Sequence, residues 1–316
     1  MRADIAVVGG GLAGLAAARL LQQGGTDFVL LEARDRLGGR ILSVGADGAP
    51  ADDGFDLGAS WFWPAMQPAL ASLVHDLGLV IFAQHTDGDW LIERVRGAPP
   101  LRYPAMRQEP PSMRIAGGTG ALVCALARSL PPERLRLGTR VARLALGDAG
   151  VTLSGVDGIL LLRARDVILA APPRVLADAL SFDPPLDPAT LARWRGTATW
   201  MAPHAKLFAL YDRPFWRDAG LSGAAQSTLG PMTEIHDATG ASGAAALFGF
   251  LGIGADHRRA IGEAAVIEAC VAQFGRLFGP PAARPIATLF KDWAADSLIA
   301  TPADRIATGH RVPGPL

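Results

Sequence analysis

The sequence has few residues of the kinds that cross-link a protein or give it a strong charge. Only Cys124 and Cys270 of its 316 residues are cysteines, too few for a disulfide framework and too far apart for a CxxC redox site. Its 30 basic and 30 acidic residues cancel, which disfavours nucleic acid or an anionic membrane surface as its main partner. Half of the residues are apolar and 19% are charged, so we expect a globular chain with a sizeable core.

Lysine is almost missing as well. Of the 30 basic residues, 28 are arginine, and only Lys206 and Lys291 are lysine. Arginine keeps its proton near neutral pH, whereas a buried lysine can lose it and take part in catalysis. The two lysines are therefore candidates for a chemical role.

Several other signals are also absent. The six histidines have no metal-ligand spacing, so no metal site is expected. There is no GxSxG motif and no P-loop motif, which argues against a serine hydrolase of that type and against a P-loop nucleotide-binding protein. Glycines and hydroxyl residues interrupt the uncharged stretch 238–255, which favours a buried strand over a membrane span. We expect a soluble, cytoplasmic protein without a membrane partner; a homodimer is left open.

The pattern along the chain predicts alternating strands and helices, typical of an α/β fold. Strands are expected at 5–8, 27–32, 79–83, 90–95, near 135, 141 and 151, and at 166–170, 206–211, 244–251 and 286–293. Helices are expected at 12–23, 66–77, 120–130, 188–195 and 258–278.

The first strand, turn and helix carry a dinucleotide fingerprint. Gly9, Gly11 and Gly14 follow the GxGxxG spacing between an apolar strand and a helix. They allow a tight turn, close approach of a pyrophosphate and close helix packing, and the helix N-terminus offers N–H groups to phosphate. Glu32 lies 18 residues after Gly14, at the end of the second strand, where an acid binds ribose hydroxyls. Its charge would repel a 2′-phosphate, which disfavours NADP.

The next residues distinguish nicotinamide from flavin. Glu32 opens the string EARDRLGGR, which ends at Gly39 and Arg40 and includes Arg34. Glycines let this loop fold back over a dinucleotide, and arginine can neutralise its pyrophosphate. Such a wrap suits a permanently held FAD better than an exchanging NAD.

With these motifs the sequence resembles the flavin-containing amine oxidases, relatives of monoamine oxidase and L-amino acid oxidase. The string 32–40 is close to that family's signature, and segments 56–61, 114–120 and 166–173 are similar to its later motifs. The resemblance implies that Gly58, Ala59, Ser60 and Trp61 run beside the flavin and that the backbone of Val141 contacts adenine.

The resemblance, through the motif KLFALYDRPFW, implies that Lys206 is the catalytic lysine that holds a water against flavin N5. The alternative is a surface lysine at the start of a strand. Trp61, Trp63, Trp200 and Tyr211 either line an aromatic substrate pocket or belong to the core. His204 and the segment 234–237 are weaker polar candidates.

The resemblance extends from residue 4 to about residue 295 and implies two interleaved lobes. These are a Rossmann-like FAD-binding lobe, 1–72 and 112–175, and a mixed α+β substrate lobe, 73–111 and 176–300. Residues 301–316 are expected to begin a third FAD segment, which the family continues with a strand and helix that have no counterpart here. We therefore expect activity to depend on that segment.

The resulting expectation is an FAD-dependent amine oxidase-like oxidoreductase. It would transfer a hydride from a C–N bond of a small amine-like substrate to flavin N5, and oxygen would reoxidise the flavin. One alternative is a C-terminally truncated homologue with weak or no FAD binding and no catalysis. Another is a flavin desaturase or an NAD(P)H-linked oxidase on the same scaffold.

Overall fold

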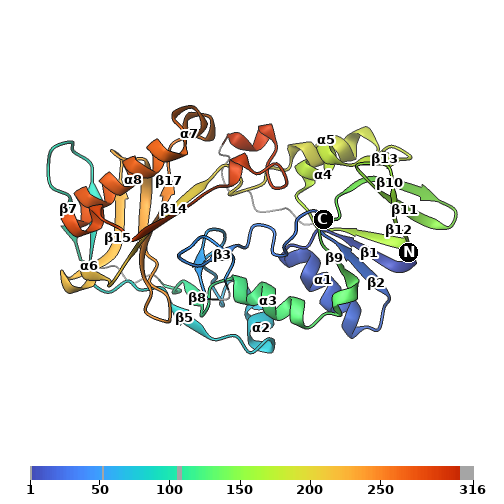
Figure 1. Cartoon of the computed structure of the whole chain (residues 1–316), viewed down its shortest axis with the longest axis horizontal. Coiled ribbons are helices and arrows are strands. Elements are labelled where there is room, and N and C mark those ends of the chain that lie inside the picture. The colour runs from blue at the N-terminus through green and yellow to red at the C-terminus, as the bar shows by residue number, and fades with distance from the viewer. Residues whose placement is uncertain (1, 52, 105–108, 307–316) are drawn as a thin grey trace. The chain divides into compact units, whose positions relative to one another are not determined.

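A computed structural model describes residues 2–51, 53–104 and 109–306 of the chain. The chain forms two units, each made of separate stretches of sequence (Figure 1). The first comprises Met1–Ile41, Val123–Ala202 and Ala294–Leu316, and the second Leu42–Leu122 and Pro203–Trp293. These bounds follow packing alone, so the assignment of lobes to FAD and substrate stays a prediction. Within the predicted segment 301–316, residues 307–316 lie outside the described residues.

The first unit contains the expected strand–turn–helix–strand opening. Its sheet has the order β13-β10-β11-β12-β1-β2-β9. The strand β1 pairs in parallel with both β2 and β12, which places helix α1 in a doubly wound arrangement. The strands are β1 (Arg2–Val8), β2 (Phe28–Leu31), β9 (Leu135–Arg136), β10 (Val141–Gly147), β11 (Gly150–Gly155), β12 (Leu160–Leu169) and β13 (Ser181–Asp183). The helical segments are α1 (Leu12–Gln23), η1 (Pro132–Arg134), α4 (Pro173–Ala179), α5 (Pro188–Gly196) and η4 (Pro302–Arg305).

The second unit is built on a largely antiparallel sheet of the order β18-β14-β17-β16-β15-β6-β7. Its strands are β6 (Asp89–Glu93), β7 (Leu101–Tyr103), β14 (Ala205–Tyr211), β15 (Leu221–Ser227), β16 (Met232–Asp237), β17 (Ala245–Leu251) and β18 (Ala287–Asp292). Two short ribbons pair β3 (Ser43–Val44) with β4 (Phe55–Asp56) and β5 (Ile81–Ala83) with β8 (Met113–Ile115). The helical segments are α2 (Pro68–Asp76), α6 (Phe215–Asp218), α7 (Ala255–Ile261), α8 (Glu263–Phe278) and η2 (Pro280–Ala283). Helix α3 (Gly120–Arg128) and the short η3 (Trp293–Ala295) lie at the chain's crossings between units.

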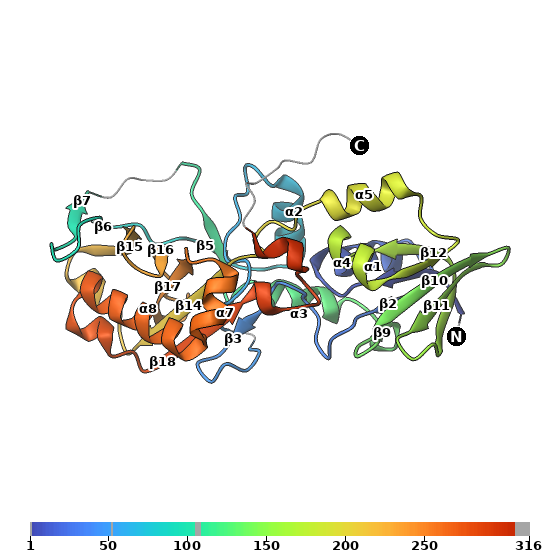
Figure 2. The same ribbon diagram turned by 90° about the horizontal axis from the view of Figure 1, so that it is seen from above.

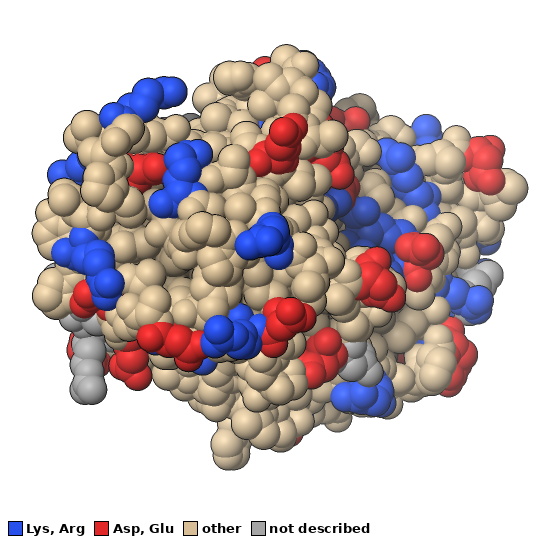
Figure 3. Space-filling model, turned by 60° about the vertical axis from the view of Figure 1, so that its left-hand side comes forward, with Lys and Arg blue, Asp and Glu red and all other residues tan. Residues whose placement is uncertain are grey.

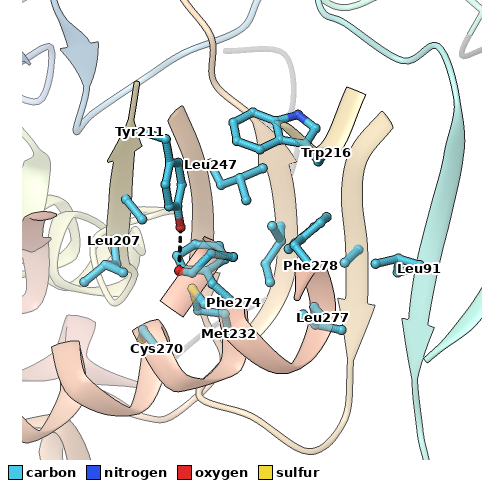
Figure 4. Close-up of a cluster of buried hydrophobic side chains, with 14 of the residues drawn as sticks. Leu91, Leu207, Tyr211, Trp216, Met232, Leu247, Cys270, Phe274, Leu277 and Phe278 are labelled. Carbon is cyan, nitrogen blue, oxygen red and sulfur yellow. Dashed lines mark hydrogen bonds between the residues drawn. The ribbon is translucent and has the colours of Figure 1, made fainter. Parts of the chain in front are cut away.

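The core of the second unit lies between α8 and one face of this sheet. Both views show α8 running along the sheet (Figures 1 and 2). Phe274 and Cys270 point from the helix toward Leu207 and Met232 (Figure 4). The opposite face of the same strands carries a second cluster, which contains Phe208 and Phe248. Strand β14 is buried on both faces, so its side chains can meet no bulk water.

The mixed α/β fold is confirmed, and some helices and strands differ from the prediction; helices α4 and α6, for example, were not predicted. The single helix expected at 258–278 is wrong, because Gly262 divides it into α7 and α8. Gly262 has φ +85°, a conformation that favours glycine and ends a helix. Strands β15 and β16 were not predicted. Their sequences LSGAAQS and MTEIHD are poor in β-branched and aromatic residues, so the usual strand signal is weak.

No helix among the described residues is both long and apolar enough to cross a membrane. On the face drawn in Figure 3, basic and acidic side chains are interspersed. That mixture matches the formal net charge of zero.

Candidate active site

The glycine turn of the first unit has the shape of a dinucleotide cradle. Strand β1 ends at Val8, and α1 begins at Leu12 with Gly11 as its N-cap. A Cβ at Gly14 would lie 1.9 Å from the carbonyl oxygen of Gly9, so helix and strand approach too closely for any side chain. A Cβ at Gly11, in contrast, would meet no atom within 4 Å.

The end of α1 at this cradle is suited to an anion. Gly11 supplies no side-chain cap, and the first turn of α1 contains no acidic residue. The first N–H groups of a helix have no partner within the helix and carry partial positive charge. Open space beside Gly11 and this helix end together fit the diphosphate of a dinucleotide.

Glu32 lies beside the glycine turn, as its spacing predicts. Its side chain is 7% exposed. One carboxylate oxygen accepts a hydrogen bond from Gly10 N at 2.6 Å, and the other accepts one from Arg34 N at 2.8 Å. Two backbone N–H groups therefore hold the acid at the cradle. That Glu32 binds ribose stays a prediction.

The loop after Glu32 folds back onto the turn. Gly38 N donates to Gly10 O at 2.8 Å, and Gly39 has φ +58°, which favours glycine. Arg36 was not singled out from the sequence, but its guanidinium donates to the carbonyl oxygens of Leu37, Gly39 and Ile41 at 3.0–3.3 Å. It thus holds the loop that the two glycines form.

The two predicted phosphate-neutralising arginines have protein partners. Arg34 forms an ion pair with Asp296 at 2.6 Å. Arg40 donates to the carbonyl oxygen of Trp200 at 2.8 Å. Val141 is buried at the start of β10, within the apolar cluster of the first sheet. Contacts of these three residues with a cofactor stay predictions.

In the second unit, Lys206 meets the segment that the sequence placed beside a flavin. The side chain starts on β14 and is 4% exposed. Its Nζ donates to Gly58 O at 2.6 Å, to Ser60 Oγ at 2.8 Å and to Asp56 O at 3.2 Å. The structure therefore brings together residues that lie about 150 positions apart, and the alternative of a surface lysine is wrong.

An aromatic wall surrounds the lysine. Its Nζ lies 4.8 Å from the ring centre of Phe248 and 5.0 Å from that of Phe250, distances at which a ring attracts a cation. Trp61 packs against both rings. Its indole N–H donates to Gln84 Oε1 at 2.8 Å. Trp61 is thus fixed at one end by a hydrogen bond and presents its rings to the wall.

The charges around Lys206 affect its pKa. Burial lowers the pKa of Lys206 from 10.5 to about 7, the nearby carboxylate of Asp56 opposes this, and the guanidinium of Arg114 adds to it. Burial raises the pKa of Asp56, and hydrogen bonds from Ser43 and Thr119 oppose that rise. Lys206 can therefore take up and release a proton near neutral pH.

The structure places further candidates from the sequence in the core, at the surface and beside the aromatic wall. Tyr211 belongs to the core, where its hydroxyl donates to Ala282 O at 2.9 Å. Trp200 is half exposed in the first unit. His236 stacks on Phe248 and lies 2.7 Å from a carboxylate oxygen of Glu234. Of these four residues, His236 and Glu234 are the pair that adjoins the aromatic wall.

A cavity of about 420 Å³ lies in the second unit. Gln84, the hydrogen-bond partner of Trp61, is part of its lining, together with His85, Arg217 and Thr239. A cavity of this size suits a small molecule.

A glycine-rich strand–turn–helix at the start of a doubly wound sheet is typical of dinucleotide-binding enzymes. Residues 12–94 and 80–312 match the family of flavin containing amine oxidoreductases. The chain belongs to this family. Family membership confirms FAD as the predicted cofactor.

Individual relatives point the same way. A putrescine oxidase of Kocuria rosea is 25% identical over 342 residues, covering 75% of this chain and 70% of the relative. A putative flavin-containing monoamine oxidase of Mycobacterium tuberculosis is 27% identical over 351 residues, covering 78% and 74%.

Two solved structures share the fold. A putrescine oxidase bound to putrescine has a TM-score of 0.82 at 23% identity, over 95% of this chain and 86% of that one. Cyclohexylamine oxidase from Brevibacterium oxydans has a TM-score of 0.82 at 21% identity, over 95% and 87%.

Proposed function

We propose that the protein oxidises a C–N bond of a small amine, with oxygen as the final electron acceptor. The amine loses a hydride from carbon and a proton from nitrogen, and water hydrolyses the resulting imine. Bound FAD would supply the acceptor for that hydride, and transfer of its two electrons to oxygen, with one proton from the amine nitrogen and one equivalent to the hydride's own, would give hydrogen peroxide. Putrescine oxidase and monoamine oxidase among the relatives support an amine as substrate.

We assign the cofactor-binding roles to residues of both units. The N-terminus of α1, with Gly9, Gly11 and Gly14, would hold the diphosphate, and Glu32 the ribose hydroxyls. Arg34, Gly39 and Arg40 would close over the dinucleotide, and the backbone of Val141 would contact adenine. The small residues of the segment 58–61 would border the flavin ring.

The observation that carries the proposal is the setting of Lys206. A buried amine whose pKa is about 7 can hold a proton for a reacting group and release it at neutral pH. A surface lysine would stay charged and hydrated. Its contacts with Gly58 O and Ser60 Oγ fix Nζ in one position, which is what a proton-transfer group requires.

The test uses the purified full chain and a panel of primary amines and diamines. We expect a flavin absorbance spectrum, bleaching by at least one amine without oxygen, and peroxide formation in air. Lys206→Met should slow reoxidation by oxygen about 100-fold or more. Lys291→Met is the matched control, because Lys291 is the chain's other lysine and faces Lys206 across β14 and β18; its rate should stay within about twofold.

Three results would overturn the proposal. Protein without flavin absorbance even after added FAD would reject the cofactor roles. A flavin that no amine bleaches, but that NAD(P)H reduces, would favour an NAD(P)H-linked oxidase. Equal reoxidation rates in the Lys206→Met and Lys291→Met proteins would reject the role of Lys206.

A further inference from the structure

Asp56 is a buried acid whose two oxygens have unequal surroundings. It ends β4 and is 1% exposed. Its Oδ1 accepts hydrogen bonds from Ser43 Oγ at 2.6 Å, Thr119 N at 2.8 Å and Thr119 Oγ1 at 2.9 Å. Its Oδ2 has no hydrogen-bond partner among the described residues.

The direction of two of these bonds is fixed. Ser43 Oγ accepts the N–H of Gly120 at 2.8 Å, so its own hydroxyl proton is directed to Asp56. The backbone N–H of Thr119 can only donate. Hydrogen bonds donated to a carboxyl oxygen stabilise the ionised form of that carboxyl group. These donors favour the ionised form of Asp56 and oppose the rise in its pKa that burial causes.

The same residue also contacts Lys206 through its backbone. Lys206 Nζ donates to the carbonyl oxygens of Asp56 and Gly58 and to Ser60 Oγ. The Asp56 side chain therefore anchors the start of the segment that holds the amine. Its charge also favours the protonated amine, and with bulk water excluded this attraction is weakly screened.

We propose that Asp56 is a positioning residue for the reaction of Lys206: its carboxylate anchors the segment 56–60 against Nζ, and its charge favours the protonated form of that nitrogen. This inference rests on the proposed function only for its catalytic consequence. The link between the two side chains can be measured without any turnover.

The other charged or titratable groups around Lys206 come from three elements. Arg114 on β8 opposes protonation of the amine. Lys291 on β18 lies directly across from Lys206, with its Nζ 4.7 Å from the ring centre of Trp293. His236 on β16 stacks on Phe248, whose ring centre lies 4.8 Å from Lys206 Nζ. Glu234 on the same strand lies 2.7 Å from the His236 ring, and Asp56 is the acid whose charge raises the pKa of Lys206.

The small number of lysines allows a direct experiment. Protein labelled with ¹³C at lysine Cε gives two signals, which Lys291→Arg assigns. For the wild-type protein we expect the Lys206 signal to titrate with a pKa of about 7. Asp56→Asn should move this midpoint about one to two pH units lower, and the Lys291 midpoint should stay in place.

Asp237→Asn is the matched control. Asp237 is equally buried in the same unit and accepts hydrogen bonds from Trp216, Arg217 and Thr239, but it does not affect the pKa of Lys206. Its substitution should leave the Lys206 midpoint unchanged. An unchanged midpoint in Asp56→Asn, or equal shifts in both variants, would overturn the proposal.

If Asp56→Asn does not fold, Ser43→Ala provides the same test with a smaller downward shift, because it removes one donor that favours the carboxylate. An unchanged midpoint in that variant would also count against the proposal. In the holoenzyme, the rate of flavin reoxidation by oxygen should depend on pH with an apparent pKa equal to the titration midpoint of Lys206 in each variant that folds. If the midpoint shifts but that apparent pKa does not, the link between the side chains stands and the proposed role of Lys206 fails.

Discussion

In the first unit backbone N–H groups hold the buried acid Glu32, whereas in the second unit the buried acid Asp56 and the amine of Lys206 are held by side chains as well as by backbone. Glu32 is held by the N–H groups of Gly10 and Arg34. Asp56 is held mainly by Ser43 and Thr119, and the amine beside it comes from a distant strand. Both acids are buried. Within the described part of the chain only one oxygen of Asp56 has hydrogen-bond partners, whereas both oxygens of Glu32 do.

This difference separates binding from proton chemistry. Backbone groups cannot change their charge, so a cradle made of them is a fixed site for a constant ligand. Buried side chains of opposite charge have coupled protonation, and small changes around them move a pKa. The second unit therefore contains a residue, Lys206, whose protonation can change near neutral pH.

The largest expected effect tests the backbone character of the cradle. Gly14→Ala places a Cβ 1.9 Å from Gly9 O, and relief of this clash must move helix or strand. We expect it to lower the free energy of unfolding by about 3 kcal/mol or more. Urea titration of the purified protein measures the loss.

Gly11→Ala is the matched change at the same turn. No atom lies within 4 Å of the new Cβ, so the free energy of unfolding should change by less than about 1 kcal/mol. The methyl group would enter the space assigned to the diphosphate, so FAD affinity should fall about tenfold or more. Equal stability losses in the two variants, or unaltered FAD affinity in Gly11→Ala, would contradict a backbone-made cradle.

The next largest effect tests whether the buried amine of Lys206 makes the stability of the protein depend on pH. Lys206 has a folded-state pKa of about 7 against 10.5 in the unfolded chain, so between these values the unfolded state binds more protons. The pH-dependent contribution of Lys206 to the free energy of unfolding is fully present above about pH 10.5 and is lost as the pH falls toward 7. The free energy of unfolding should rise by about 1.4 kcal/mol per pH unit within this window.

Urea titrations between about pH 7.5 and pH 9.5 measure this slope. Other groups also titrate, so the relevant quantity is the slope of the wild-type protein minus that of Lys206→Met. Lys291→Met should keep the wild-type slope. If wild type and Lys206→Met gave parallel curves, the amine would not be titrating in a buried site.

The sequence predicts the cradle better than the lysine site. The cradle depends on residues within one strand–turn–helix–strand unit, so the spacing from Gly9 to Glu32 places them correctly. Lys206 and Gly58 were selected through the family resemblance, since no local pattern joins positions so far apart. Asp56 lies within the segment 56–61, which is similar to a motif of the family. Its partners Ser43 and Thr119 contact it only through tertiary packing.

Arg36 and Arg114 show the same limit. Arg36 differs from its neighbours in the arginine-rich loop only by where its guanidinium points, which sequence spacing does not give. Arg114 is buried with its guanidinium on the carbonyl oxygens of Ala238 and Thr239. Burial of a cation depends on the surrounding fold, so a composition rich in arginine could not identify it.

The smallest expected effect compares the two acids directly. Glu32→Gln puts an NH₂ group against a backbone N–H, because both oxygens of Glu32 accept from backbone. Two donors facing each other in a buried site should cost about 1–3 kcal/mol of stability. Asp56→Asn can place its NH₂ at the position of Oδ2, which has no hydrogen-bond partner among the residues that the structure describes, and keep the bonds to Oδ1. Measured near pH 9, where Lys206 is largely neutral, Asp56→Asn should therefore cost less than Glu32→Gln. The opposite order would mean that Asp56 is held by its charge alone, and the contrast between a backbone-held and a side-chain-held acid would lose its physical basis.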